Sequence, residues 1–232
     1  MTFNVRHKSL TGYLILLHLL LSVLVLKTDF LPRLTAKLGN NTTHTSDPHV
    51  ANMLKHQRWM DDAVPAGAII FLGDSITQSL ATAAVAPYSV NYGIGTATTS
   101  DLLQAMPNYR SLGRADTVVL AIGINDILRG KQEGLSERYR QIVQSIPPST
   151  ALVWSGVMPA ARTLADPDQI IFANQTIKAL CAARPNCVFL DTVILLSNNR
   201  EPNPELFLKD GLHLSPAGYK AWIAALKRAI SR

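Results

Sequence analysis

The amino-acid sequence predicts an α/β fold, a three-layer α/β/α sandwich around a five-stranded parallel sheet. Five short runs rich in apolar and β-branched residues recur along the chain, and stretches with helical spacing separate them. Strands buried on both faces have continuous apolar runs of this kind, and helical crossovers make neighbouring strands parallel. The expected strands are 67–73, 88–94, 116–126, 151–159 and 187–193.

Capping residues and prolines define the helices between these runs. The stretch 99–109 begins with good N-cap residues, and Pro107 is expected to disturb its last turn. Pro147 ends the helix before the fourth strand, whereas Pro216 suits the first turn of an amphipathic C-terminal helix. The expected helices are near 50–62, up to about 84, 99–109, near 134–145, 168–183 and 215–230.

Length and composition favour one domain with a well-buried core. The chain has 232 residues, of which 47% are hydrophobic and 16% charged, and a net charge of +6. No block of Lys and Arg interleaved with aromatic residues occurs, which argues against a nucleic-acid partner. Cys181 and Cys187 leave two possibilities open, a disulfide or two buried thiols.

The N-terminus carries a targeting signal. Arg6 and Lys8 precede the apolar run "TGYLILLHLLLSVLVL", and this arrangement predicts an uncleaved signal anchor with the rest of the chain exported. Secretion after cleavage of a signal peptide is the alternative. The predicted organisation is a cytoplasmic flank (1–10), an anchor (11–26), a linker (27–47) and a catalytic-type domain (48–232).

Polar and small residues stand where the predicted strands end. Ser75 follows the first strand, Gly95 the second and Asn125 the third. Asp210 and His213 lie three residues apart in a loop beyond the fifth strand. Because open α/β sheets bind ligands at the carboxyl ends of their strands, we expect these groups to converge.

A hydroxyl, an imidazole and a carboxylate are the groups that acyl transfer requires. Serine is a weak nucleophile until a base removes its proton, and His213 is the candidate base for Ser75. Asp210 would hold the correct imidazole tautomer and stabilise the imidazolium. Each residue alone has an ordinary structural explanation, such as a helix cap or a loop hydrogen bond, but their joint occurrence favours catalysis.

The tetrahedral intermediate of acyl transfer also requires hydrogen-bond donors for its oxyanion. The candidates are the backbone N–H of Ser75, a backbone N–H of Gly95 or Thr96, and the side-chain amide of Asn125. The sequence therefore predicts a complete set of groups for acyl transfer.

Four segments, "FLGDSIT", "NYGIGTATT", "IGIND" and "DGLHLSPAGY", resemble in order and spacing the signature blocks of the SGNH/GDSL hydrolases, a family of esterases and lipases. The resemblance covers roughly 65–230 and implies a three-layer α/β/α esterase fold. It also implies that Ser75 is the nucleophile and first oxyanion donor, that Asn125 donates through its side chain, and that Asp210 and His213 complete the triad. No metal or organic cofactor is expected.

One block departs from the family pattern. The family usually has glycine where Thr96 stands. The family's donor at this position is a backbone N–H, which threonine retains. We therefore assign this oxyanion donor to Thr96, with Gly95 as its neighbour, and expect the β-branched side chain to narrow the pocket or shift the donor.

The expected reaction is removal of short acyl groups, acetyl in particular, from extracytoplasmic carbohydrate. The alternatives are lysophospholipase or thioesterase activity, and a non-catalytic, membrane-tethered glycan-binding or scaffold domain. An acyltransferase would use the same acyl-enzyme. The sequence does not determine the oligomeric state.

Two other folds fit the sequence less well. The segment "GIGTAT" (93–98) with Asp116 is similar to a dinucleotide fingerprint, but Thr98 replaces its third glycine and the segment follows the second strand. The chain has no G-x-S-x-G elbow, which argues against the α/β-hydrolase fold.

Overall fold

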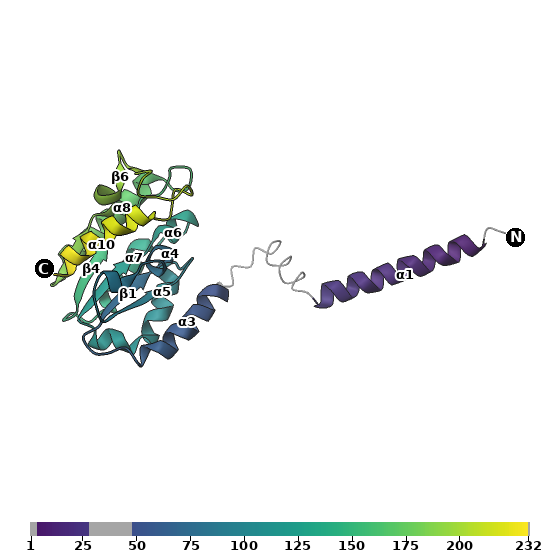
Figure 1. Cartoon of the computed structure of the whole chain (residues 1–232), viewed down its shortest axis with the longest axis horizontal. Coiled ribbons are helices and arrows are strands. Elements are labelled where there is room, and N and C mark those ends of the chain that lie inside the picture. The colour runs from purple at the N-terminus through teal and green to yellow at the C-terminus, as the bar shows by residue number, and fades with distance from the viewer. Residues whose placement is uncertain (1–3, 28–47, 232) are drawn as a thin grey trace. The chain divides into compact units, whose positions relative to one another are not determined.

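The computed structural model describes residues 4–27 and 48–231 (Figure 1). The chain divides into two units, 1–45 and 46–232. In the first unit, helix α1 (Asn4–Lys27) covers the apolar run predicted as an anchor. Within the part of the chain that the structure describes, none of the helices combines the length and apolar character needed to cross a bilayer. The predicted linker, except for Lys27, lies outside the described residues.

The second unit contains the predicted five-stranded parallel sheet, with strand order β2-β1-β3-β4-β5. The first strand of the chain lies between the second and third, so the connections change direction between β1 and β3. Ligands bind at such a switch point in open α/β sheets. The strands are β1 (Ile69–Gly73), β2 (Ser89–Gly93), β3 (Thr117–Ala121), β4 (Ala151–Ser155) and β5 (Cys187–Leu190).

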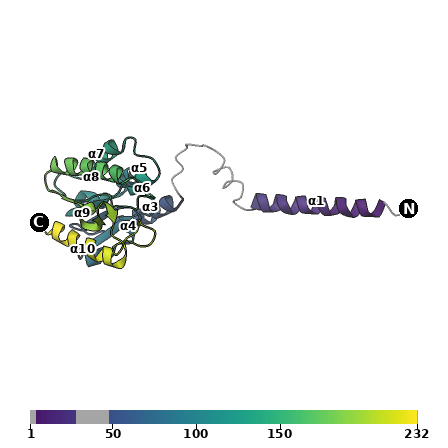
Figure 2. The same ribbon diagram turned by 90° about the horizontal axis from the view of Figure 1, so that it is seen from above.

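Helices cover both faces of this sheet, which confirms the three-layer sandwich. Figure 2 shows α5, α7 and α8 on one side of the sheet and α9 and α10 on the other. The helices of this unit are α3 (Pro48–Asp61), α4 (Ser75–Gln78), α5 (Thr99–Ala105), α6 (Ile124–Leu128), α7 (Leu135–Gln144), α8 (Pro167–Ala182), α9 (Thr192–Leu196) and α10 (Pro216–Ile230). Short 3₁₀ segments are η1 (Thr82–Ala84), η2 (Met106–Asn108) and η3 (Arg110–Arg114).

Successive side chains of the strands fill two separate cores, one on each face of the sheet. On β1, Ile70 and Leu72 face the core under α5, α7 and α8, whereas Phe71 faces the core under α10. Val118 and Val119 divide in the same way on β3. This is the period of two expected of a strand that is covered on both faces. All buried residues of both cores belong to the second unit.

Three of the apolar runs end as strands well before the predicted residue. The fourth was expected to reach residue 159, but β4 ends at Ser155. The third run was expected to reach residue 126, but β3 ends at Ala121. Gly123 then turns the chain with φ of +126°, and α6 begins at the next residue, so Asn125 lies in a helical first turn. The fifth run ends at Leu190 because the Asp191 side chain caps α9.

The helix expected to reach about residue 84 ends at Gln78, and the separate 3₁₀ segment η1 follows it. The remaining helix boundaries follow the sequence signals closely. Helix α5 stops at Ala105 and continues as the 3₁₀ segment that contains Pro107, as expected. Its N-cap is Thr98, one residue before the predicted start, and Asp101 completes a capping box. A two-stranded hairpin, β6 (Ser197–Asn198) with β7 (Glu201–Pro202), was not predicted.

The two cysteines form a disulfide that joins the end of α8 to the start of β5. The Cα atoms of Cys181 and Cys187 are 5.3 Å apart. The structure therefore decides between the two alternatives that the sequence left open.

Replacing Gly123 with alanine should destabilise the domain by about 2–4 kcal/mol, a fall in Tm of about 5–15 °C. A Cβ on Gly123 would lie 2.0 Å from Tyr139 Oη, and the φ of +126° disfavours any L side chain. The matched control is Gly113→Ala, since a Cβ there meets nothing within 4 Å. Thermal unfolding measures both variants, and equal Tm values would contradict the expectation.

Candidate active site

Ser75 lies on a strand-to-helix turn in which position 73 has room only for glycine. A Cβ on Gly73 would lie 2.1 Å from Thr77 Oγ1 and 2.3 Å from the carbonyl oxygen of Ala121. Asp74 is the N-cap of α4, and its Oδ1 accepts the N–H of Ile76 at 3.0 Å. Ser75 therefore stands in the first turn of α4, at the end of the interior strand β1 and beside the switch point of the sheet.

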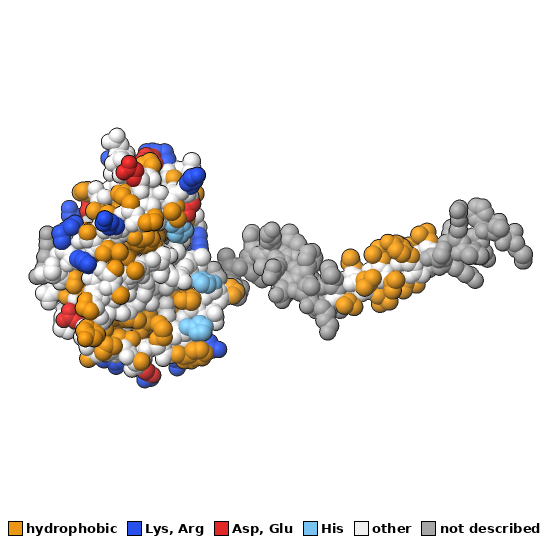
Figure 3. All heavy atoms as spheres, viewed as in Figure 1, with side chains coloured by type: hydrophobic (Ala, Val, Ile, Leu, Met, Phe, Trp, Pro, Cys, Tyr) orange, Lys and Arg blue, Asp and Glu red, His pale blue; other side chains and the backbone are white. Residues whose placement is uncertain are grey.

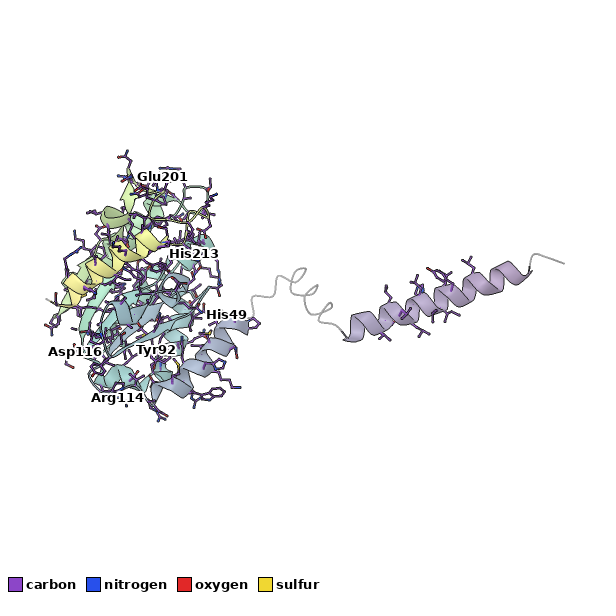
Figure 4. All side chains as sticks on the ribbon, in the orientation of Figure 1. His49, Tyr92, Arg114, Asp116, Glu201 and His213 are labelled. Carbon is purple, nitrogen blue, oxygen red and sulfur yellow. A yellow bond between two sulfur atoms is a disulfide. The ribbon has the colours of Figure 1, made fainter. Side chains whose placement is uncertain are left out.

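The structure brings Ser75, His213 and Asp210 together as predicted, although Ser75 and His213 are 138 positions apart. Ser75 Oγ lies 3.0 Å from His213 Nε2, and His213 Nδ1 lies 2.8 Å from Asp210 Oδ2. In Figure 4, His213 lies at the carboxyl ends of the strands, whereas Asp116, which precedes β3, lies at the opposite ends. The three groups form a continuous hydrogen-bonded chain.

The environment of Asp210 keeps it ionised. Partial burial raises the pKa of Asp210. The backbone N–H groups of His213 and Leu212, at 3.0 and 2.9 Å from Oδ1, lower it, as does the His213 ring, and together they outweigh the effect of burial. The net result is a pKa below the ordinary value. An ionised carboxylate against Nδ1 places the ring proton on that nitrogen, so Nε2 is left to accept the Ser75 proton.

The loop that carries His213 is anchored by backbone contacts. The N–H of Leu208 donates to the carbonyl oxygen of His213 at 2.7 Å, and Phe207 pairs with Leu214 in an isolated bridge. Ser215 caps α10 directly after this bridge. The imidazole therefore projects from a segment fixed on both sides.

The predicted oxyanion donors lie on the segment after β2 and on α6. Asn125 Nδ2 donates to the carbonyl oxygen of Ala97 at 3.0 Å, which orients the amide against this segment. Thr96 has φ of +67°, a left-handed conformation that favours glycine and costs a β-branched residue about 1–2 kcal/mol. The usual glycine of the family at this position is explained by that conformation.

The N–H of Gly95, the predicted neighbour of the second oxyanion donor, has a partner inside the protein. It donates to Oε1 of Gln78, the last residue of α4, so this N–H is already hydrogen-bonded within the protein. A Cβ on Gly95 would lie 2.8 Å from the same oxygen, so the close approach requires glycine. The assignment of the second oxyanion donor to Thr96 stays a prediction.

Two residues that hold this segment were missed by the sequence analysis. Gln78 binds Gly95, and Asn91 Nδ2 donates to the carbonyl oxygens of Thr77 and Leu80 at 2.7 and 3.0 Å. Asn91 Oδ1 also accepts the N–H of Gly93 at 2.9 Å. The only sequence signal was the position of Gln78, three residues after the predicted nucleophile.

Beside Asn125, the buried carboxylate of Asp126 ties three helices together. It accepts the N–H and the hydroxyl of Thr99 at 2.9 and 2.6 Å, and Arg138 lies 3.3 Å away. Burial raises the pKa of Asp126, and the bonds from Thr99 and Arg138 oppose that rise. These contacts fix α6, and with it Asn125, against α5 and α7.

Among the described residues, no group of three or more His, Cys, Asp or Glu side chains is arranged to hold a metal ion. The groups of the site are those of acyl transfer: a hydroxyl hydrogen-bonded to an imidazole, an ionised carboxylate behind the imidazole, and amide donors nearby.

The model of the GDSL-like Lipase/Acylhydrolase family matches residues 71–221, more than half of the chain. The chain belongs to this family. Membership implies ester hydrolase activity. The matched segment contains every residue that the sequence assigned to the site. No curated protein sequence matches the chain.

Solved structures with the same fold include three informative examples. A Streptococcus pneumonia protein described by reference to platelet activating factor is 26% identical, with a TM-score of 0.70 over 78% of this chain and 92% of that chain. A GDSL-like lipase from Bacteroides thetaiotaomicron is 21% identical, with a TM-score of 0.63 over 78% and 98%. A variant of Axe2, an acetyl-xylooligosaccharide esterase from Geobacillus stearothermophilus, is 22% identical, with a TM-score of 0.57 over 72% and 94%.

The folding stability of the parent should decrease as pH rises, and Asp74→Asn should abolish this decrease. Burial raises the pKa of Asp74 from 3.8 to about 7. The folded state therefore retains a proton between about pH 4 and 7 that the unfolded chain has lost, and stability falls with pH through this window. Asparagine keeps the helix cap without the charge.

Thermal unfolding at pH 5 and pH 8 tests this expectation. The Tm of Asp74→Asn relative to the parent should be higher at pH 8 than at pH 5. Asp116→Asn, an exposed carboxylate beside β3, is the control and should show no such difference. A Tm difference for Asp74→Asn that is independent of pH would show that the buried charge is not the cause.

Gln78→Ala should lower kcat on p-nitrophenyl acetate about 10- to 100-fold, with KM nearly unchanged. Loss of the acceptor for the Gly95 N–H frees the peptide next to the one that carries the Thr96 N–H, and a lost oxyanion donor costs about 10²–10³ in kcat. Gln144→Ala is the matched control, because it is an exposed glutamine at the end of α7. A wild-type kcat in Gln78→Ala would exclude this role.

Proposed function

We propose that the protein is a serine esterase that removes short acyl groups, acetyl in particular, from carbohydrate through an acyl-serine intermediate. The observation that carries the proposal is the continuous chain from Ser75 Oγ through the His213 imidazole to the Asp210 carboxylate, with contacts of 3.0 and 2.8 Å. Such a chain activates a serine that is otherwise a weak nucleophile.

In the first half of the reaction, His213 Nε2 accepts the Ser75 hydroxyl proton as Oγ attacks the ester carbonyl carbon. The carbonyl π electrons move to oxygen, and the Ser75 N–H, the Thr96 N–H and the Asn125 amide stabilise the oxyanion. The intermediate collapses, His213 gives its proton to the departing sugar oxygen, and the acyl group remains on Ser75.

In the second half, His213 accepts a proton from water as the water oxygen attacks the acyl carbon. Collapse of the second intermediate breaks the bond to Ser75 Oγ, which takes the proton back from His213, and the carboxylic acid leaves. Asp210 stays ionised throughout and stabilises the imidazolium at each stage. Serine is regenerated without any other reactant than water.

A short acyl group on a carbohydrate suits the exposure of the site. The side chains of His213 and Asp210 are 36% and 47% exposed, so the reacting groups lie near the surface, where a sugar chain can reach them. The description of Axe2 as an acetyl-xylooligosaccharide esterase supports the same substrate class. An apolar tunnel, by contrast, is what a long acyl chain would require.

We propose export for the catalytic unit. The basic flank and apolar run at 1–26 support an anchored or cleaved export signal. The disulfide between Cys181 and Cys187 also supports an oxidising compartment.

The test compares p-nitrophenyl acetate, butyrate and palmitate, using residues 46–232, which contain both cores. The acetate and butyrate esters should be hydrolysed, and Ser75→Ala should reduce kcat by at least about 10³-fold, with Tm within a few degrees of the parent. Release of acetate from acetylated xylooligosaccharide should depend on Ser75 in the same way.

The other outcomes separate the alternatives. Hydrolysis confined to palmitate would replace carbohydrate with lipid as the substrate class. A folded parent without any Ser75-dependent turnover would support a scaffold or a strict acyltransferase, and would overturn the proposal.

A further inference from the structure

A second surface feature lies on α3, distinct from the catalytic residues. It is a groove of about 710 Å³ between α3 and the η2–η3 segment, a volume within the usual range for ligand sites. We call it the α3 groove, and its main lining residues are Lys55, Arg58, Trp59, Pro107, Asn108 and Arg110.

Buried contacts beneath the α3 groove hold its two walls in place. On the inner side of α3, the buried Gln57 side chain accepts a hydrogen bond from the Tyr109 hydroxyl, and the buried Asp61 side chain accepts one from Tyr92 at 2.8 Å. Tyr109 stacks on Tyr92 with ring centroids 4.4 Å apart. Asp61 also accepts the N–H of Ser111 at 3.1 Å. The groove is therefore preformed.

The α3 groove combines positive charge with an exposed aromatic ring. Three cations, Lys55, Arg58 and Arg110, line it, and Asp62, which lies 3.6 Å from Arg110, is its single acidic residue. The Trp59 side chain is 64% exposed, and Lys55 Nζ lies 5.0 Å from its ring centroid. Figure 3 shows basic, histidine and hydrophobic side chains together over α3.

Helix α3 connects this groove to the catalytic edge. His49 lies at the first turn of this helix (Figure 4). Its Nε2 lies 3.3 Å from the position that a Cβ on Gly95 would take. Further along, Gln57 Nε2 donates to the carbonyl oxygen of Gly93 at 3.4 Å. Ten residues separate His49 from Trp59, about 15 Å along the helix axis. A chain molecule bound in the groove can therefore extend along α3 toward the active site.

We propose that the α3 groove binds an acidic polysaccharide, so that the substrate of the esterase is an acylated sugar chain bearing carboxylates. Guanidinium and ammonium groups recognise carboxylates, and an indole packs against the C–H face of a sugar ring. A lipid bilayer is a poorer match, because its surface is flat and the groove is concave. This inference rests on the proposed function.

The experiment measures binding of polygalacturonate to residues 46–232 by calorimetry, with dextran as the neutral polymer. Polygalacturonate should bind, dextran should not, and affinity should fall at least tenfold between 50 and 500 mM salt. Trp59→Ala and Arg58→Ala should each weaken binding at least fivefold. The matched controls are Phe172→Ala, since Phe172 is 65% exposed on α8, and Arg228→Ala on α10.

Activity assays separate this inference from the proposed function. Trp59→Ala should leave p-nitrophenyl acetate hydrolysis unchanged and raise KM for acetylated polygalacturonate. Ser75-dependent ester hydrolysis without polygalacturonate binding would overturn the α3 groove proposal alone. Equal loss of binding in the control variants, or binding only to phosphatidylglycerol vesicles, would also overturn it. Absence of any Ser75-dependent hydrolysis would instead defeat the proposed function.

Discussion

The packing of α4 against the strand ends is the constraint on which the rest of the site depends. A Cβ on Gly93 would lie 2.3 Å from the backbone nitrogen of Gln78, and Gly73 is equally confined by Thr77. The helix that carries Ser75 can approach β1 and β2 this closely only because both strands end in glycine. The same approach brings Gln78 to Gly95, so one short helix positions the nucleophile and the segment with the second oxyanion donor.

Buried polar groups then align the remaining parts of the site. Asp74 caps the helix of the nucleophile, and Asp126 joins the helix of Asn125 to its neighbours. Both carboxylates are almost fully buried, and burial raises the pKa of each. Asp210 lies in the opposite environment, exposed and surrounded by donors, and its pKa is lowered. Burial and hydrogen bonding therefore shift the pKa values of three carboxyl groups at one edge of the sheet in different directions.

The α3 groove lies away from this rigid edge and has a different surface character. The catalytic groups form one hydrogen-bonded chain, whereas the groove offers separate cations around an indole ring. An esterase acting on a polymer gains selectivity from contacts remote from the scissile bond, since these contacts raise the local concentration of the substrate without changing the chemistry.

The sequence by itself determined the α/β fold class, the succession of strands and helices along the chain, and the identities of Ser75, Asp210 and His213. These follow from local patterns, since apolar periodicity reports burial and the reactive groups sit in short recognisable blocks. Tertiary structure alone decided the contacts between distant segments: Gln78 with Gly95, the disulfide at Cys181, and the walls of the α3 groove. It also decided that Asn125 lies in a helix, because the turn at Gly123 is a property of the backbone geometry. Such contacts depend on which elements become neighbours, and no local pattern encodes that.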